Sequence, residues 1–402
     1  MRLTFIQYAG DYREAYARLT AGGKETYQAQ RYSVDFVGSL SRSAEISVIC
    51  AMSDGEYDEI QGNGVRAIGL AMSSRLEARD LLDAVARTRP DRLILTTPIL
   101  PIVRWANARD IRLLAVLADS FEQRTWRAML RYRRLAKSLN GRAVEFVANH
   151  GINASVSLSR IGVKPSKIVP WDWPPSHRPA DFTPRRRRRD CAFRLIYVGS
   201  VSPAKGVEDL LHAVAALKAQ KLSVLLTVIG EDCGSKMQAK AVKLGIADVV
   251  QFLGRRANDE IPSAMREADC VVIPSRHEYP EGLPLTIYEA LSTHTPIIAS
   301  DHPMFIGALN HRTSALIFPA SNVQMLASAI RELSQDDSLY EHLSANSAEA
   351  WQGLQLPVRW ADLIEAWISD DPDQRKWILN HSLASQSYAD RITTNSLRRY
   401  TV

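Results

Sequence analysis

The sequence has few cysteines and no long apolar run, and both shortages limit what the protein can be. Its 402 residues include four scattered cysteines without Cys-x-x-Cys spacing, namely Cys50, Cys191, Cys233 and Cys270. This distribution argues against a disulfide framework or a zinc site and fits a reducing, cytoplasmic compartment. No run approaches the roughly 18 apolar residues of a membrane span. The apolar start Met1–Ile6 predicts a first strand rather than a signal peptide.

Charge is unevenly divided along the chain. Residues 1–170 carry 25 Lys/Arg and 17 Asp/Glu, a balance of +8, whereas residues 171–402 carry 25 and 27, a balance of −2. An arginine-rich surface of general composition would explain this imbalance. A first half that faces an anionic partner would explain it equally well. A nucleic-acid partner is a poor alternative, since no recognised nucleic-acid motif is present.

Short apolar segments alternate with amphipathic ones in the first half. The predicted strands are Leu3–Tyr8, Ile46–Ala51, Arg92–Thr96, Leu113–Ala118 and Val144–Ala148, and the predicted helices include Glu25–Ser43 and Leu76–Arg89. This alternation is typical of a doubly wound parallel sheet. Residues 1–170 are therefore predicted to form one Rossmann-like domain, on the acceptor side if the protein joins two substrates.

The same alternation restarts after a segment rich in proline and arginine. Residues 171–191 contain Trp171, Trp173 and the run Arg185–Arg189, a composition that indicates a linker. The later predicted strands are Leu195–Val198, Leu222–Ile229, Val249–Leu253, Cys270–Ile273, Pro296–Ala299 and Ala315–Phe318. Residues 192–350 thus predict a second Rossmann-like domain, with a ligand cleft between the two domains.

The chain becomes helical after Phe318. The predicted helices are Val207–Ala219 within the second domain, then Asn322–Leu333, Asp337–Ala350 and a tryptophan-bearing segment at Leu356–Ile368. We expect residues 351–370 to pack back towards the N-terminal domain, and residues 371–402 to form a partly ordered tail.

The strongest chemical signal is the segment His277–Leu291, which follows a predicted strand. Pro284 suits the first position of a helix, so the N–H groups of Gly282 and Leu283 should point out of that helix's N-terminus, where phosphate binds. Glu289 follows Glu281 by eight residues, which span about 12 Å if helical. Glycosidase carboxylates lie roughly 5–9.5 Å apart, so the spacing suits the two ends of an elongated ligand better. An isolated pair at this spacing would more often be a solvated loop and a helix residue.

The whole segment resembles the retaining glycosyltransferases of family 4 type, the glycosyl transferases group 1, which have the GT-B fold. Their hallmark is Glu-Gly-(Phe/Leu)-(Gly/Pro)-Leu followed by a helix with Glu-Ala, and Thr295–Asp301 matches a later stretch of the family. The resemblance covers about residues 199–333. It implies that Glu281 contacts the donor sugar, Glu289 the nucleotide ribose, and the turn at Gly282–Leu283 the diphosphate.

Two further motifs are similar to the family's pattern. Gly199, Ser200 and Lys205 occupy a strand–turn–helix where the family has Gly-Arg-Leu-x-x-x-Lys-Gly, so Lys205 is expected to neutralise the leaving diphosphate. Ser200 replaces the usual arginine and supplies no charge. Gly230 and Arg255 follow predicted strands at places that the family uses for the nucleotide. A glycine after a strand is by itself usually only a turn.

The first half fits the family less closely. Gly22 and Gly23 precede a predicted helix, and a glycine pair in this region of the family abuts the diphosphate or the acceptor. Ala118-Asp119 stands where the family often has His-Asp. Asp119 is therefore a candidate catalytic residue, and a helix-capping role is equally compatible with the sequence.

The resemblance implies sugar transfer from a nucleotide-diphosphate donor to an acceptor hydroxyl with retention, in polysaccharide or glycolipid biosynthesis. No cofactor is expected, and no divalent ion is expected to be required, because neither α/β half contains an Asp-x-Asp metal motif. Two alternatives stay open: a catalytically degenerate relative that binds a nucleotide sugar or a partner, and a sugar-nucleotide epimerase on the same fold. The epimerase would need a base at the sugar carbon that the sequence does not reveal.

One basic segment stands apart from these motifs. Glu122–Arg142 interleaves seven basic residues with apolar ones at helical spacing: Arg124, Arg127, Arg131, Arg133, Arg134, Lys137 and Arg142, with Trp126, Met129, Leu130, Tyr132 and Leu135. Such a helix either packs its apolar face on the sheet or docks on an anionic membrane surface. A lipid-linked acceptor would explain why such a helix docks on a membrane.

Overall fold

The computed structural model describes residues 1–72, 77–122, 125–189 and 192–392. The chain divides into two compact units. Unit 1 comprises residues 1–25, 29–174 and 356–389, and unit 2 comprises residues 26–28, 175–355 and 390–402. Two residues named in the sequence analysis, Cys191 and Arg124, lie outside the described residues.

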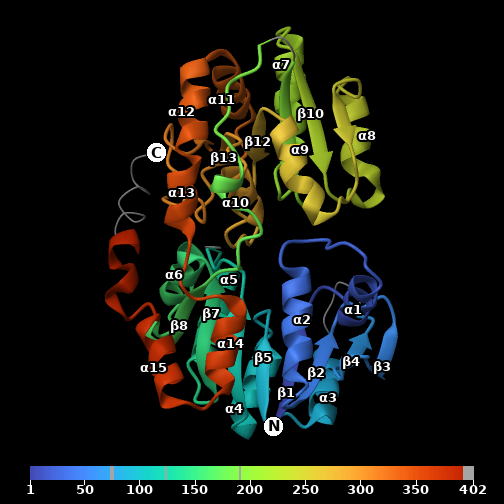
Figure 1. Ribbon diagram of the computed structural model, residues 1–402, viewed down its shortest axis with the longest axis vertical. Coiled ribbons are helices and arrows are strands. Elements are labelled where there is room, and N and C mark those ends of the chain that lie inside the picture. Colours follow the sequence, from blue (N-terminus) through green and yellow to red (C-terminus); the bar gives the residue numbers. More distant parts are fainter. Residues whose placement is uncertain (73–76, 123–124, 190–191, 393–402) are drawn as a thin grey trace. The chain divides into compact units, whose positions relative to one another are not determined.

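Unit 1 is an eight-stranded sheet with helices on both faces (Figure 1). Its strands are β1 (Arg2–Gln7), β2 (Glu45–Cys50), β3 (Glu56–Ile60), β4 (Arg66–Leu70), β5 (Arg92–Leu95), β6 (Arg112–Leu117), β7 (Val144–His150) and β8 (Ile168–Trp171). Its helices are α1 (Tyr12–Thr20), α2 (Gln30–Leu40), α3 (Ala78–Thr88), α4 (Leu100–Arg109), α5 (Trp126–Leu139), α6 (Ile152–Arg160), α14 (Trp360–Ile368) and α15 (Pro372–Asn380). The strand order β3-β4-β2-β1-β5-β6-β7-β8 reverses between β1 and β5.

Two apolar layers hold the helices of unit 1 on the sheet. One layer joins α1, α2 and α14 to the strands through residues such as Phe5, Phe36 and Trp360. The other joins α3, α4 and α5 to the opposite face through residues such as Leu81, Ile102 and Leu135. Alternate strand residues point to opposite faces, so nearly continuous apolar strands such as β6 are buried on both sides.

Unit 2 repeats this plan with six parallel strands in the order β11-β10-β9-β12-β13-β14. These are β9 (Phe193–Val198), β10 (Val224–Ile229), β11 (Val250–Phe252), β12 (Cys270–Ile273), β13 (Ile297–Ser300) and β14 (Leu316–Phe318). The helices are α7 (Val207–Ala219), α8 (Lys236–Lys243), α9 (Ile261–Glu267), α10 (Leu285–Ser292), α11 (Val323–Gln335), α12 (Asp337–Ala345) and α13 (Ser347–Leu354). The strand order reverses between β9 and β12, so the loops that follow these two strands diverge there.

Several elements differ from the sequence-based expectation. The predicted helix Asp337–Ala350 is broken at Asn346, whose main-chain and side-chain N–H groups both donate to the carbonyl of His342 and so close α12. β3 escaped prediction because it is an acidic edge strand, and β8 because it contains a proline. The expected tail contains the helix α15, which begins after the cap Asp371.

The segment rich in proline and arginine belongs partly to each unit. Trp171 ends β8, and the division between the units falls between Pro174 and Pro175. Beyond it, Arg185 packs on unit 2, where its main-chain N–H donates to Ser344 Oγ at 2.7 Å and its guanidinium donates to the carbonyl of Ala268 at 2.5 Å. Part of the arginine run is therefore fastened to unit 2 rather than exposed as a free linker.

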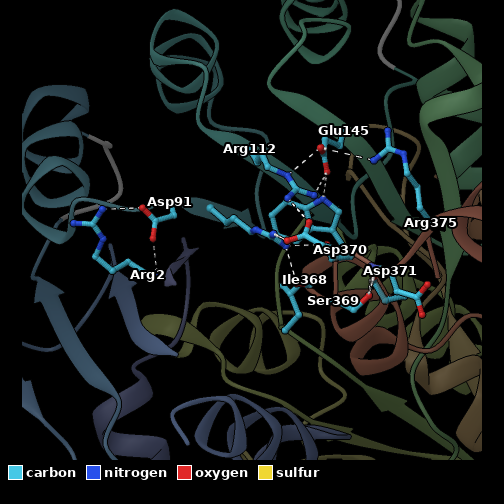
Figure 2. A network of polar contacts seen from close by, with 12 residues as sticks. Arg2, Asp91, Arg112, Glu145, Ile368, Ser369, Asp370, Asp371 and Arg375 are labelled. Carbon is cyan, nitrogen blue, oxygen red and sulfur yellow. Dashed lines mark hydrogen bonds and ion pairs between the residues drawn. The ribbon is translucent and has the colours of Figure 1, made fainter. Parts of the chain in front are cut away.

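A polar network fastens the C-terminal segment to the amino ends of strands in unit 1 (Figure 2). Arg92, at the start of β5, donates to the carbonyls of Trp367 and Ile368 at 3.1 and 2.8 Å and also to Asp370. Arg112 bridges Asp370 and Glu145, and Glu145 accepts the indole N–H of Trp367 at 2.6 Å. The turn between α14 and α15 is thus bound to three strands of the sheet.

Among the described residues, no helix is both long enough and apolar enough to cross a bilayer.

We expect Arg92→Met to lower the free energy of unfolding of unit 1 by about 1–3 kcal/mol, because a buried and a partly buried carbonyl lose their donor. Urea unfolding followed by tryptophan fluorescence measures it, since every tryptophan except Trp351 lies in unit 1. The matched control is Arg2→Met, which removes the exposed Arg2–Asp91 pair of Figure 2. Surface pairs contribute little, so equal shifts in the two variants would contradict the prediction.

Candidate functional site

The candidate site of unit 2 is built from the two loops at the point where its strand order reverses. One loop follows β9 and the other follows β12, which are neighbours in the sheet but continue in opposite directions. Ligands of open α/β sheets bind at such a point, beyond the carboxyl ends of the strands. Chemistry-bearing residues from both loops meet here.

The loop after β9 makes a close turn that presents Lys205. Gly206 ends this loop at φ +73°, and a β-carbon at Gly206 would lie 2.0 Å from the carbonyl oxygen of Pro274 in the other loop. Only glycine permits this approach. Gly199 and Ser200 begin the loop, and the Tyr197 hydroxyl donates to the carbonyl of Ser200 at 2.7 Å. The predicted residues Gly199, Ser200 and Lys205 thus lie on one turn.

The loop after β12 carries Glu281, which pairs with Lys205. The Lys205 ammonium lies 2.5 Å from Glu281 Oε1, and the same oxygen accepts the Ser275 hydroxyl at 2.6 Å. The two side chains are only 14% and 6% exposed. The Lys205 ammonium also lies 4.3 Å from the centre of the Tyr279 ring, a cation–π distance. The structure therefore holds a mostly buried cation and carboxylate at the reversal of strand order.

Main-chain donors follow Glu281 directly. Within the described ranges, the N–H groups of Gly282, Leu283, Leu285 and Thr286 have no intramolecular acceptor. α10 begins at Leu285, and Pro284 precedes it as the N-cap rather than occupying the first helical position expected from the sequence. Free N–H groups at a helix N-terminus form an anion site. Glu281 lies before the helix, so the assumption of eight helical residues between the glutamates is wrong.

Glu289 lies one turn inside α10 and is half-buried. Burial raises the pKa of its carboxyl to about 8. In the part of the chain that the structure describes, this carboxyl has no hydrogen-bond or ionic partner. A desolvated carboxyl without a partner costs stability, and groups of this kind gather at functional sites.

The weaker candidates lie at the ends of β10 and β11. A β-carbon at Gly230 would lie 1.8 Å from the carbonyl oxygen of Gly199, so this glycine permits two loops to approach each other. The main-chain N–H of Gly230 donates to the carbonyl of Gly254 at 2.9 Å. The exposed Arg255 pairs with Glu231, which follows Gly230. These residues form the adjoining part of the same sheet edge.

Polar residues that the sequence did not reveal support the loop that carries Glu281. His277 donates to Asp301 Oδ1 at 2.8 Å, and this hydrogen bond raises the pKa of His277. The buried ring of His302 bonds the carbonyl of Tyr279 at 3.0 Å. The available signal was His277 in the glutamate motif and Asp301-His302 about twenty residues later, but the sequence alone does not pair residues so far apart.

The candidates from the first half lie in unit 1. Gly22 and Gly23 end α1 rather than follow β1: Gly22 has φ +82°, and the main-chain N–H of Gly23 donates to the carbonyl of Arg18 at 2.8 Å. This is the arrangement of a helix C-cap. The loop directly after β1 contains Gly10 instead.

Asp119 follows the carboxyl end of β6, and its main chain is held by Asn149. The Asn149 side chain accepts the N–H of Asp119 at 3.2 Å and donates to its carbonyl at 2.8 Å. Burial raises the pKa of the Asp119 carboxyl to about 6. Thr125, not Asp119, caps the following helix α5, so the capping alternative is wrong.

No group of three His, Cys, Asp or Glu side chains placed to hold a metal ion occurs within residues 1–72, 77–122, 125–189 and 192–392.

Comparison with known proteins shows what the segment that carries this site is similar to. Residues 184–350 match the family described as Glycosyl transferases group 1. D-inositol 3-phosphate glycosyltransferase of Streptomyces bingchenggensis is 29% identical over 185 residues, which are 42% of this chain and 40% of the relative. The chain therefore spans about two fifths of the length of this curated relative.

Solved structures show the same fold over most of the chain. Sucrose-phosphate synthase of Thermosynechococcus elongatus has a TM-score of 0.63 at 16% identity, over 88% of this chain and 94% of its own. HepE of Anabaena, solved with UDP and glucose, has a TM-score of 0.62 at 17% identity, over 88% and 95%. Residues 184–350 are thus similar to the group 1 glycosyltransferases, and the two α/β units have the fold of these solved structures, the GT-B type.

Proposed function

We propose that this protein is a retaining glycosyltransferase that moves a hexosyl group from a nucleoside-diphosphate donor to an acceptor hydroxyl. The observation that carries the proposal is the mostly buried Lys205–Glu281 pair beside the free N–H groups that precede α10. UDP is the first nucleotide to test, because HepE was solved with UDP and with UDP-glucose. Retention rests on the resemblance to the family 4 enzymes.

The donor diphosphate is assigned to the anion site of unit 2. Lys205 supplies a full positive charge, and Gly282 and Leu283 supply main-chain N–H groups. As the bond between the anomeric carbon and the diphosphate oxygen breaks, its electron pair leaves with the diphosphate. The negative charge there grows, so fixed donors stabilise the transition state more than the ground state. The acceptor oxygen forms the new bond to the same carbon and loses its proton.

The remaining groups receive roles along the length of the donor. Glu281 is assigned to the donor sugar's hydroxyls and Glu289 to those of the ribose, while Gly230 and Arg255 are assigned to the base side. On unit 1, Asp119 is assigned to the acceptor hydroxyl, because a carboxyl with a pKa of about 6 is poised to accept a proton near neutral pH. Gly22 and Gly23 are given no donor contact in this proposal, because both of their main-chain N–H groups already bond carbonyls of α1. No step requires a metal ion.

Ser200 favours one second candidate, a relative that binds a nucleotide sugar without transferring it. Its exposed side chain carries no charge at the position where the family has an arginine. A donor-hydrolysis screen across UDP-, GDP- and ADP-sugars, with calorimetry of the matching nucleotides, tests both candidates. Hydrolysis supports the transferase. Binding without hydrolysis or transfer supports the second candidate, and no binding of any nucleotide rules out both.

We expect Lys205→Ala to lower kcat more than it weakens donor binding, because the diphosphate charge is greatest in the transition state. Losing a charge-assisted bond of this kind should raise the activation free energy that kcat reports by about 1.5–3 kcal/mol. Steady-state kinetics measure it, with Lys218→Ala as the control, since Lys218 pairs with the exposed Asp248. A rise in KM at constant kcat would show that Lys205 only binds the donor.

We expect Glu289→Gln to weaken nucleoside-diphosphate binding by about 1.5–3 kcal/mol at pH 9, since ribose hydroxyls bond best to an ionised carboxylate. The folded pKa of about 8 lies above the ordinary value, so Glu289 favours folding below pH 4.5 and loses this effect as pH rises through 8. The variant should therefore be more stable than wild type at pH 9 and equally stable near pH 4. Calorimetry and thermal unfolding at both pH values measure these effects.

For wild type, nucleotide affinity should rise between pH 7 and pH 9, and the variant should lose this rise. If Glu289→Gln left the nucleotide affinity at pH 9 unchanged, the assignment of Glu289 to the ribose would be wrong. A variant that weakened binding without gaining stability at pH 9 would contradict the pKa argument.

Helix α5 presents two apolar faces rather than one. Its core face buries Ala128, Tyr132, Leu135, Ala136 and Leu139. Trp126, Met129 and Leu130 face outward and are 70%, 48% and 43% exposed. The exposed basic residues Arg127, Arg131, Arg133, Arg134 and Lys137 lie on the same helix. Tyr132 and Leu135 were predicted to share one apolar face with the outward residues, but they lie in the core.

This outward face is assigned to an anionic bilayer, which would bring the enzyme to a lipid-linked acceptor. Three exposed apolar side chains among five exposed cations match the composition of interfacial helices. Each cation near an anionic surface adds about 1 kcal/mol. Packing on the sheet explains the core face of α5 but gives the exposed Trp126 no partner in the core.

We expect wild type to co-sediment with phosphatidylglycerol-containing vesicles at low salt and to release at high salt. Charge reversal at Arg131, Arg133 and Arg134 should abolish binding, and Trp126→Ser with Leu130→Ser should weaken it. The control reverses three exposed lysines of unit 2: Lys221, Lys236 and Lys243. Wild type remaining in the supernatant at low salt, or an equal loss in the control, would eliminate the membrane assignment.

A further inference from the structure

Three consecutive residues at the end of β13 support the loop that carries Glu281. The Ser300 hydroxyl donates to the carbonyl of Ser275 at 2.6 Å, and Asp301 accepts His277 at 2.8 Å. His302 bonds the carbonyl of Tyr279 at 3.0 Å. Adjacent residues of one segment therefore hold alternate residues of the other.

Of these three residues, His302 also makes a hydrogen bond within its own segment. Its side chain is buried, with the whole residue 1% exposed. Its Nδ1 accepts the main-chain N–H of Met304 at 3.2 Å, so the ring proton lies on Nε2, which donates to Tyr279. Burial lowers the pKa of His302 and keeps this neutral form. Both ring nitrogens therefore make hydrogen bonds, Nδ1 within its own turn and Nε2 to the loop that carries Glu281.

The Tyr279 carbonyl that His302 bonds also accepts a hydrogen bond within the loop that carries Glu281. The main-chain N–H of Glu281 donates to the same Tyr279 oxygen at 2.8 Å. The Tyr279 ring lies under the Lys205 ammonium. One carbonyl therefore fixes the direction in which the chain reaches Glu281 and the N–H groups that follow it.

We propose that His302 is a positioning residue of the donor site: its Nε2–H bond to Tyr279 sets the turn that brings Glu281 to Lys205 and aims the N–H groups of Gly282 and Leu283 at the diphosphate. The proposal rests on the proposed function for the identity of the ligand. The effect of His302 on the conformation of the loop is independent of that function. His302 acts through Tyr279 and touches no reacting atom.

Two substitutions separate the contact to the loop from the contact within the turn. In His302→Gln the side-chain amide nitrogen occupies the place of Nε2, so the bond to Tyr279 can remain. In His302→Asn the amide reaches only as far as Nδ1, so the acceptor for Met304 can remain while the bond across to the loop is lost. The two variants have similar polarity and differ in reach.

Calorimetry with UDP and steady-state kinetics with UDP-glucose measure the effect on the site. We expect His302→Asn to raise the Kd for UDP and the donor KM about tenfold, with a smaller change in the acceptor KM. His302→Gln should lie within twofold of wild type, and the two variants should have similar Tm values, because each loses one of the two hydrogen bonds of the ring. Equal losses in both variants, or none in either, would overturn the proposal.

Hydrogen exchange of the unliganded protein decides the proposal even if UDP does not bind. We expect the amides of Tyr279 and Glu281, which donate within the loop at 3.1 and 2.8 Å, to exchange about tenfold faster in His302→Asn. They should keep wild-type rates in His302→Gln. Wild-type exchange in His302→Asn would refute the positioning role. Absence of nucleotide binding by wild type, with the expected exchange pattern, would refute only the proposed function.

Discussion

Parallel strand pairing constrains both units of this protein, because it brings the carboxyl ends of every strand except the antiparallel edge strand β3 to one edge of its sheet. In unit 2 this edge is where the loops after β9 and β12 separate, and there Lys205 meets Glu281. In unit 1 the corresponding edge carries Asp119 after β6 and His150 as the last residue of β7. Neither arrangement needs residues close in sequence, since the sheet brings the strand ends together.

The charged side chains at these edges either have a partner that stabilises them or are placed where a ligand could supply one. Desolvating a lone ammonium or carboxylate costs several kcal/mol, and the Lys205–Glu281 pair with the Ser275 hydroxyl offsets this cost. Glu289 has no such compensation among the described residues, and the raised pKa of its carboxyl records the cost. The contrast separates a preorganised pair from a group whose ionised form a ligand would stabilise.

Unit 1 depends on the return of the chain's C-terminal segment. The buried Asp172 lies at the end of β8, accepts a bond from His150 at 3.1 Å and lies 3.5 Å from the Arg359 guanidinium. Trp173 and Trp360 stack beside it at 5.5 Å. The network around Asp370 fastens the far end of the same segment. Residues almost two hundred positions apart thus complete one core.

The sequence alone determined the alternation of strands and helices, since buried parallel strands must be apolar, and it located the glutamate motif because helix-start chemistry is local. β12 and α7 have the predicted bounds. Only the tertiary structure decided what depends on distant partners. Gly22 and Gly23 cap α1, Tyr132 and Leu135 of α5 face the core while Trp126 does not, and His302 supports a loop twenty residues earlier. The directions of these side chains follow from sheet order and packing, which no local pattern encodes.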